Sequence, residues 1–172
     1  MAAAAGTNAP REVAVIADTH LRAAGRLPEA CVRRLAAADL IVHAGDVVGR
    51  AVLEELRALG PPLRAVRGNV DEPALAAELP ERLVLELAGG ARCGVVHDAG
   101  EARGRLARLR RAFPDCDAVI FGHSHLPLHE ADDGFQIFNP GSPTVRRRAP
   151  RHTMGMLQAG AGTLAFELLA LD

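Results

Sequence analysis

Two histidines stand one residue apart in the segment Phe121-Gly122-His123-Ser124-His125, directly after the apolar run 118–121. Imidazole is the commonest metal-binding side chain, and two on one loop can reach adjacent positions in space. Gly122 would allow the backbone to approach closely whatever is bound. Taken alone, the pair could equally be structural or surface histidines, so its interpretation depends on the rest of the chain.

Four other short apolar runs also end in polar side chains of the metal-binding type. These side chains are Asp18 and His20, then Asp46, then Asn69 and Asp71, and then His97. Carboxylate, imidazole and amide ligands without thiolate suit manganese, iron or zinc better than copper(I) or an iron–sulfur cluster. These ligands are more than one ion needs, and they suit two ions about 3.5–4 Å apart that share a carboxylate.

The first half of the chain alternates strand-like and helix-like segments, which favours a parallel sheet with right-handed crossovers. We expect strands at 12–17, 40–44 and 63–66, and helices at 28–38 and 51–59. Ligands on such sheets gather at the carboxyl ends of the strands, where the first three polar clusters lie.

The second half is richer in short strands. We expect strands at 82–87, 92–96, 119–121, 126–130, 135–138, 153–158 and 163–171, with one amphipathic helix at 103–113. Asp-Asp-Gly and Gly-Ala-Gly turns predict that the last four strands form an antiparallel run. The predicted fold is an α/β two-sheet sandwich with helices on its outer faces and strand-end loops that converge on one edge.

Length and composition limit the class of protein. A chain of 172 residues is long enough for one domain, expected at 11–172, after a disordered leader at 1–10 that lacks signal-peptide features. A formal charge of −1 leaves no basic footprint for nucleic acid, and no stretch is apolar enough to cross a membrane. Cys31, Cys93 and Cys116 match no disulfide or zinc pattern, so reduced thiols and a cytoplasmic location are expected.

The ordered series DTH, GD, GNVD, VVH and GHSH resembles the calcineurin-like metallophosphoesterase superfamily. The short length and the segment Asn139-Pro140-Gly141-Ser142 resemble its small prokaryotic branch, the YfcE-type phosphodiesterases. The resemblance implies one metal held by Asp18, His20, Asp46 and His125, and another held by Asp46, Asn69, His97 and His123. Asp46 would then bridge the two ions.

The same resemblance implies a hydrolase acting on a small phosphoester with two divalent cations. Manganese is the first expectation, with iron, zinc, nickel and magnesium as alternatives. A water or hydroxide that bridges the cations would attack phosphorus in line. Asp46, Asn69 and His97 would act at the reacting centre, and Asp71 would orient a histidine or a water from behind the ligands.

Two positions depart from the family pattern. Val70 stands where the superfamily's phosphatases carry a histidine, and His97-Asp98-Ala99 stands where the small branch often has His-Gly-His. Both changes reduce the supply of a general acid, which favours phosphodiesters with acidic leaving groups over phosphomonoesters.

Other interpretations stay open. Asp18 and Asp46 could be helix N-caps, and His97 could be a core histidine. The fold also occurs in a retromer-type scaffold subunit that binds proteins without catalysis, although the retained histidines favour an enzyme. Arg50 and Arg67 could contact a phosphate, whereas the run 146–148 is expected to be solvated surface. Homo-oligomers are compatible with the sequence.

Overall fold

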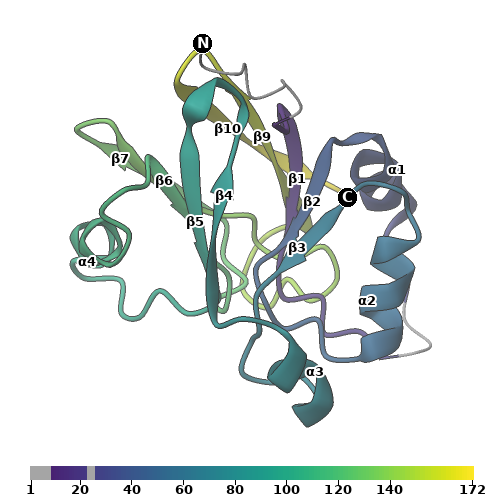
Figure 1. Cartoon of the computed structure of the whole chain (residues 1–172). Helices are drawn as coiled ribbons and strands as arrows, with labels where there is room; N and C mark the ends of the chain where they lie inside the picture. Colours follow the sequence, from purple (N-terminus) through teal and green to yellow (C-terminus); the bar gives the residue numbers. More distant parts are fainter. Residues whose placement is uncertain (1–8, 23–25) are drawn as a thin grey trace.

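The computed structural model describes residues 9–22 and 26–172, so most of the expected disordered leader lies outside the described residues. Within these ranges two five-stranded mixed sheets stand face to face, with helices on their outer sides (Figure 1). The predicted α/β two-sheet sandwich is therefore confirmed. In the described residues, no helix is long and apolar enough to cross a membrane.

The first sheet has the strand order β10-β9-β1-β2-β3. Its strands are β1 (Glu12–Ile16), β2 (Leu40–His43), β3 (Leu63–Ala65), β9 (Thr153–Gly160) and β10 (Thr163–Ala170). The first three run parallel, as the strand–helix alternation predicts, and β9 is antiparallel to both β1 and β10. Because Ile16 pairs with His43 and His43 with Ala65, the three parallel strands end at one level.

The second sheet has the strand order β4-β5-β6-β8-β7. Its strands are β4 (Arg82–Glu86), β5 (Arg92–Val96), β6 (Ala118–Ile120), β7 (Leu128–Asp132) and β8 (Phe135–Asn139). Strands β5, β6 and β8 run parallel, while β4 and β7 are antiparallel edge strands. β7 begins later than expected because Pro127 has no N–H to donate to a strand ladder.

The expectation of one antiparallel run for the last four strands is wrong. β7–β8 and β9–β10 are antiparallel hairpins, but they belong to different sheets, and β8 runs parallel to β6. Turn residues specify each hairpin locally, whereas burial decides the sheet. Ile137 of β8 packs in the layer under α4, and Leu157 of β9 packs between the sheets.

Helices α1 (Glu29–Ala37) and α2 (Arg50–Arg57) cover the first sheet, and α4 (Arg105–Ala112) covers the second (Figure 1). Alternate residues of β1 face opposite layers: Val13 and Val15 lie between the sheets, whereas Ala14 and Ile16 pack with the layer of α1 and α2. This is the two-residue period of a strand buried on both faces.

Helix α3 (Pro73–Glu78) was not predicted, because its six residues are too few for a clear helical period. Proline at its first position fits a helix start, since that N–H has no partner within a helix. A short 3₁₀ helix at Ala88–Gly90 joins β4 to β5. Neither element carries a predicted site residue.

Candidate metal centre

All seven predicted metal ligands lie in the loops that follow β1, β2, β3, β5 and β6. They form one cluster joined by short contacts, most of them between side chains: Asp18, His20, Asp46, Asn69, His97, His123 and His125. Asp18 and His125 are fully buried, whereas Asn69 and His123 are exposed. The cluster therefore has a closed inner side and an open outer side.

The backbone of these loops is unusual. In the described part of the chain, nine non-glycine residues have positive φ, and five of them are predicted ligands: Asp18, His20, Asp46, His123 and His125. Residues other than glycine avoid this backbone region, and each one held there costs about 1–3 kcal/mol of free energy. Such concentration of strain is typical of a functional site rather than of ordinary turns.

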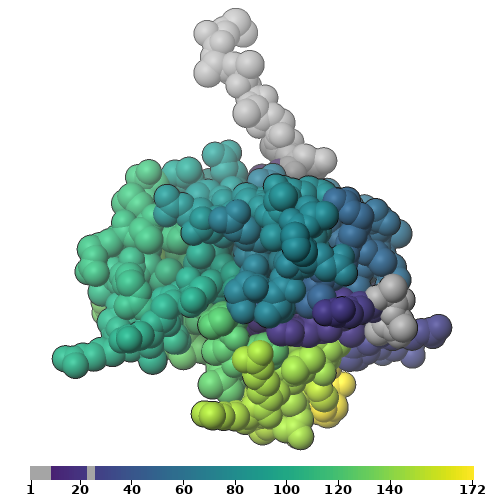
Figure 2. All heavy atoms as spheres, turned by 90° about the horizontal axis from the view of Figure 1, so that it is seen from below, coloured from purple at the N-terminus to yellow at the C-terminus, as the bar shows by residue number. Residues whose placement is uncertain are grey.

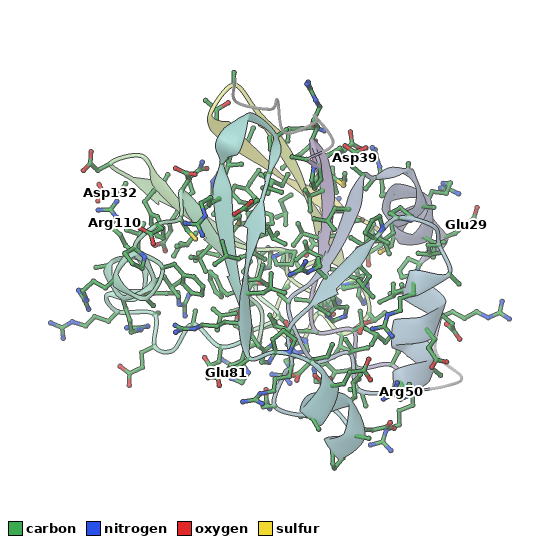
Figure 3. All side chains as sticks on the ribbon, viewed as in Figure 1. Glu29, Asp39, Arg50, Glu81, Arg110 and Asp132 are labelled. Carbon is green, nitrogen blue, oxygen red and sulfur yellow. The ribbon has the colours of Figure 1, made fainter. Side chains whose placement is uncertain are left out.

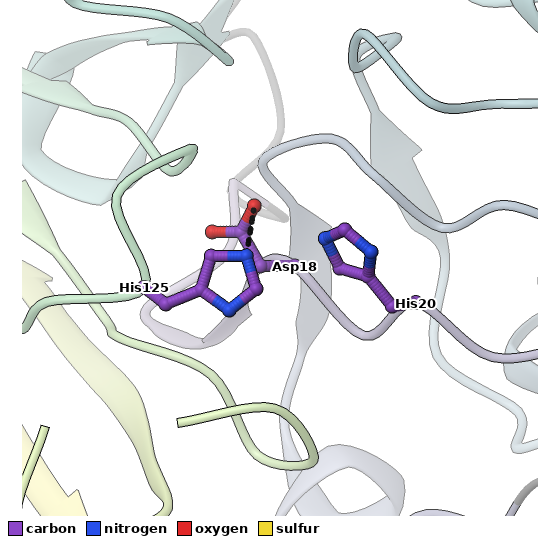
Figure 4. Close-up of side chains that lie close together, drawn as sticks. All are labelled: Asp18, His20 and His125. Atoms are coloured by element: carbon purple, nitrogen blue, oxygen red, sulfur yellow. Dashed lines mark ion pairs between the residues drawn. The ribbon is translucent and has the colours of Figure 1, made fainter. Parts of the chain in front are cut away.

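The inner group consists of Asp18, His20 and His125 (Figure 4). One ligand atom from each lies within 4.8 Å of the others, and Asp18 Oδ1 is 3.6 Å from His125 Nε2. Asp18 Oδ2, His20 Nε2 and His125 Nε2 are buried without a hydrogen-bond partner. Burial of polar atoms without a hydrogen bond is costly, so three such atoms in one group indicate a site adapted to a cation.

The outer group is built around Asn69. Its side-chain oxygen lies 3.0 Å from Nε2 of His97 and 3.0 Å from Nδ1 of His123. The two imidazole rings meet edge to face, with centroids 5.2 Å apart. An amide oxygen and two imidazole nitrogens at this distance could hold a second ion of the borderline class.

Asp46 stands between the two groups. Its Oδ2 atom lies 3.3 Å from Nε2 of His20 and 3.3 Å from Nε2 of His97. The grouping differs from the expected one in one respect, because Asp18 also clusters with Asp46 and His97 within 4.8 Å. Both carboxylates therefore face the region between the predicted sites.

Two glycines make room for this packing. A Cβ on Gly68 would lie 2.0 Å from Asp46 Oδ1, and a Cβ on Gly45 would lie 2.4 Å from His97 Nδ1. Gly45 also has φ +94°, a conformation that other residues rarely adopt. The glycines of the GD and GNVD segments are thus required by close approach of the ligands.

Backbone carbonyls orient two of the histidines. His97 Nδ1 lies 2.8 Å from the carbonyl oxygen of Ala44, and His125 Nδ1 hydrogen-bonds the carbonyl of Val145. When Nδ1 donates to a carbonyl, Nε2 is left with its lone pair directed at the site, which is the arrangement found behind metal-binding histidines.

Asp71, expected to orient a histidine or a water, hydrogen-bonds two backbone groups. Its carboxylate accepts from the backbone N–H of Val48 at 2.7 Å and of Gly68 at 2.6 Å. It thereby joins the loop after β2 to the loop after β3. Asp71 holds Asp46 and Asn69 in place through the backbone of those loops.

Several positioning residues were not singled out from the sequence. Ser142 Oγ donates to the carbonyl of Asp18 at 2.8 Å, and Asn139 Nδ2 donates to the carbonyl of Gly122 at 2.9 Å. Thr19 Oγ1 lies 3.0 Å from Nε2 of the fully buried His43. Asn139 and Ser142 belong to the Asn-Pro-Gly-Ser segment, which the sequence alone does not connect to the first strand.

Burial and neighbouring charges separate the pKa values of the two carboxyls. Burial raises the pKa of Asp18 to about 7, with the nearby Asp46 adding to the effect. Burial opposes ionisation of Asp46 as well, but hydrogen bonds from His97 and from the N–H of Val70 lower its pKa to about 2. Asp46 therefore ionises at a lower pH than Asp18.

Burial and neighbouring groups also shift the pKa values of the histidines. Burial lowers the pKa of His20 and of His125, so both are neutral ligands near pH 7. Burial also acts against a charge on His97, but its hydrogen bonds to Asp46 and Ala44 raise its pKa overall. A divalent cation would compete with that proton.

The arginines expected near the site have carboxylate partners. Arg50, at the start of α2 close to α3, pairs with Glu78 at 2.5 Å (Figure 3). Arg67 pairs with Glu81 at 3.0 Å and lines a cavity of about 260 Å³ beside Asn69 and His97. Of these two, Arg67 is the one placed next to the ligands.

A two-sheet α/β sandwich with carboxylates and imidazoles gathered at its strand ends defines a metallophosphoesterase-like protein. The chain belongs to the calcineurin-like phosphoesterase superfamily, whose domain model matches residues 12–162. A probable metallophosphoesterase of Methanocaldococcus jannaschii is 37% identical over 139 residues, which cover 78% of this chain and 69% of that protein.

Solved structures share the fold. Two structures of Vps29 from Entamoeba histolytica, one of them complexed with Zn²⁺, align with TM-scores of 0.74 and 0.72 at 23% identity, covering 94% of this chain and 99% of theirs. A novel archaeal phosphodiesterase aligns with a TM-score of 0.71 at 20% identity, covering 92% and 99%. At this identity the likeness shows the fold alone.

Proposed function

We propose that the protein is a metal-dependent phosphodiesterase with two divalent cations. The observation that carries this proposal is the cluster of two carboxylates and four imidazoles, in which three buried ligand atoms lack any hydrogen-bond partner. Membership of the phosphoesterase superfamily supports the choice of a phosphoester as the substrate.

The donor set fits the cations. Asp18, His20, Asp46 and His125 would hold one ion, and Asp46, Asn69, His97 and His123 would hold the other. Manganese is the proposed metal, and the Zn²⁺ bound by a structural neighbour supports zinc as the first alternative. When bound, the cations would supply an acidified water as nucleophile and neutralise negative charge on the phosphoryl oxygens.

The chain's own residues provide position and charge. The N–H of Val70 donates to Asp46 Oδ1 at 3.0 Å, which aims the other oxygen between His20 and His97. Asn69 and His123 are exposed at the open side, so the substrate would approach there. His97 is held by the carbonyl of Ala44 through Nδ1, so its Nε2 would be directed at the cation that it helps to hold.

The preference for diesters rests on the residues beside the ligands. Val70, next to Asn69, is 43% exposed, and Leu126, next to His125, is 42% exposed. Ala99 stands where the branch often carries a second histidine, and an alanine side chain cannot donate a proton. Without the two histidines of the family pattern, the site would suit esters with an acidic leaving group.

A non-catalytic scaffold is the second candidate, because Vps29 has the same fold. The test is hydrolysis of bis-p-nitrophenyl phosphate by metal-stripped protein, with and without added manganese, beside an Asp46→Asn variant. Manganese-dependent turnover that the variant loses would support the diesterase. A p-nitrophenyl monoester cleaved faster than the diester would favour a phosphomonoesterase, and no turnover with manganese, zinc, nickel or magnesium would favour the scaffold.

A further inference from the structure

The three consecutive arginines 146–148 have different surroundings, although the sequence suggested one solvated run. Arg146 Nη1 donates to the carbonyl of Ala149 at 2.7 Å, which closes a turn. Arg147 has φ +48°, a strained value for a long side chain. Within the described residues, Arg147 and Arg148 have no hydrogen bond or ion pair.

The loop that carries Arg147 is fastened to the ligand loops at three points. Ser142 Oγ donates to the carbonyl of Asp18, and Thr144 Oγ1 donates to the carbonyl of Thr19 at 2.6 Å. The carbonyl of Val145 hydrogen-bonds His125 Nδ1. In the view from below, the yellow-green loop lies against the purple residues of the first strand's loop (Figure 2). Arg147 therefore starts from a rigid base beside the inner ligand group.

The charge of Arg147 acts on that group. Burial is the main influence on the pKa of Asp18, His20 and His125, but the positive charge of Arg147 contributes a lowering to all three. Its neighbour Arg148 is not among the main influences on these three pKa values. Arg147 is thus close enough to the ligands to share their electrostatic environment.

A guanidinium in this position needs an explanation. It repels any cation at the inner group, and no carboxylate of the described residues pairs with it, in contrast to Arg50 and Arg67. Arg147 is exposed, so its guanidinium is free to bind an anion beside the predicted cation ligands. The anion expected at a phosphoesterase centre is the phosphoryl group itself.

We propose that Arg147 contacts a non-bridging oxygen of the substrate's phosphoryl group and so supplies a charge that the cations alone do not. This inference rests on the proposed function. It also offers a source of positive charge in a chain that lacks the histidines expected at positions 70 and 99. The guanidinium cannot serve as a general acid, because it stays protonated in proteins, so its role is binding and charge neutralisation.

The proposal predicts different effects of Arg147 on the affinity for phosphate and on the affinity for manganese. Loss of the positive charge should weaken phosphate binding and, at the same time, leave manganese binding equal or tighter, because cation repulsion is removed. Damage to the loop would instead weaken both, since the loop also orients Asp18 and His125. The two effects can be measured separately.

The experiment uses calorimetric titration of the full chain, first with manganese and then, on manganese-loaded protein, with inorganic phosphate. The variants are Arg147→Gln, Arg147→Lys and, as the matched control, Arg148→Gln. We expect Arg147→Gln to weaken phosphate binding about tenfold, as for the loss of a charge-assisted hydrogen bond of about 1.4 kcal/mol. Arg147→Lys should retain part of the affinity, and Arg148→Gln should match the parent protein.

Three results would overturn the inference: phosphate affinity unchanged in Arg147→Gln, an equal loss in Arg148→Gln, or a parallel fall in manganese affinity. Absence of phosphate binding by the parent protein would overturn it too. If phosphate binds through Arg147 but bis-p-nitrophenyl phosphate is not hydrolysed, the inference stands and the proposed function fails. If bis-p-nitrophenyl phosphate is hydrolysed and Arg147→Gln changes neither KM nor kcat, the proposed function stands and the inference fails.

Discussion

Gly68 and Asp46 pack so closely that a Cβ on the glycine would lie 2.0 Å from Oδ1 of the aspartate. The same Cβ would lie 2.2 Å from the backbone nitrogen of Asp46, so no side-chain rotation removes the clash. The position of the central carboxylate therefore depends on the absence of a side chain in the neighbouring loop.

Replacement of Gly68 by alanine should displace Asp46 and with it the contacts to His20 and His97. We expect Gly68→Ala to weaken manganese binding at least about tenfold and to destabilise the fold by about 1–3 kcal/mol, the usual cost of overpacking. Gly160→Ala is the matched control, because a Cβ there meets nothing within 4 Å. Equal manganese affinity in both variants would contradict the packing argument.

The role of Asp71 can be tested by Asp71→Asn. Its carboxylate accepts two backbone N–H groups, so we expect a loss of about 2 kcal/mol in the free energy of unfolding. The pH profile of kcat should change little, because Asp71 hydrogen-bonds no histidine in the described residues and its charge is a minor influence on the pKa of His20. Asp115→Asn, at an exposed carboxylate, serves as the control. A shifted pH profile with unchanged stability would restore the role expected from the sequence.

His43 should make the metal-free protein sensitive to acid. Burial lowers the pKa of His43 to about 3, with the neighbouring His97 adding to the effect, whereas the unfolded chain binds a proton near pH 6.5. The unfolded state thus holds more protons below pH 6.5, so the free energy of unfolding should fall as the pH decreases, by up to about 1.4 kcal/mol per pH unit.

This effect is measured by urea denaturation of the metal-free protein at pH 7.5, 6 and 5, beside His43→Gln. The variant should be less stable at pH 7.5, because it alters the contact with Thr19, but its stability should depend less steeply on pH. Identical slopes for the two proteins would mean that His43 is protonated in the folded state as well.

The cysteines should differ in reactivity toward a thiol reagent. Burial raises the pKa of Cys31 to about 12 and raises that of Cys93 as well, so neither forms the reactive thiolate in the folded state. Cys116 is partly exposed. We expect one thiol to react per native molecule and three after denaturation. Rapid labelling of Cys31 without unfolding, detected by mass spectrometry, would contradict this burial.

The sequence by itself determined the fold class and the composition of the candidate site. Strand–helix alternation predicts the parallel part of the first sheet, and polar residues after each strand mark the edge where ligands gather. These features are local, because a strand's period and the residue after its end are both read within a few positions. That is why Asp18, His20 and Asp46 could be named before their distances were known.

Only the tertiary structure decided how distant segments meet. It places β8 parallel to β6 and sends β9 to the other sheet, since burial of Ile137 and Leu157 on different layers has no signature in the turns. It also brings the loop of Ser142 onto Asp18 and directs Asp71 to backbone N–H groups. These contacts depend on packing between residues far apart in the chain, which no local pattern records.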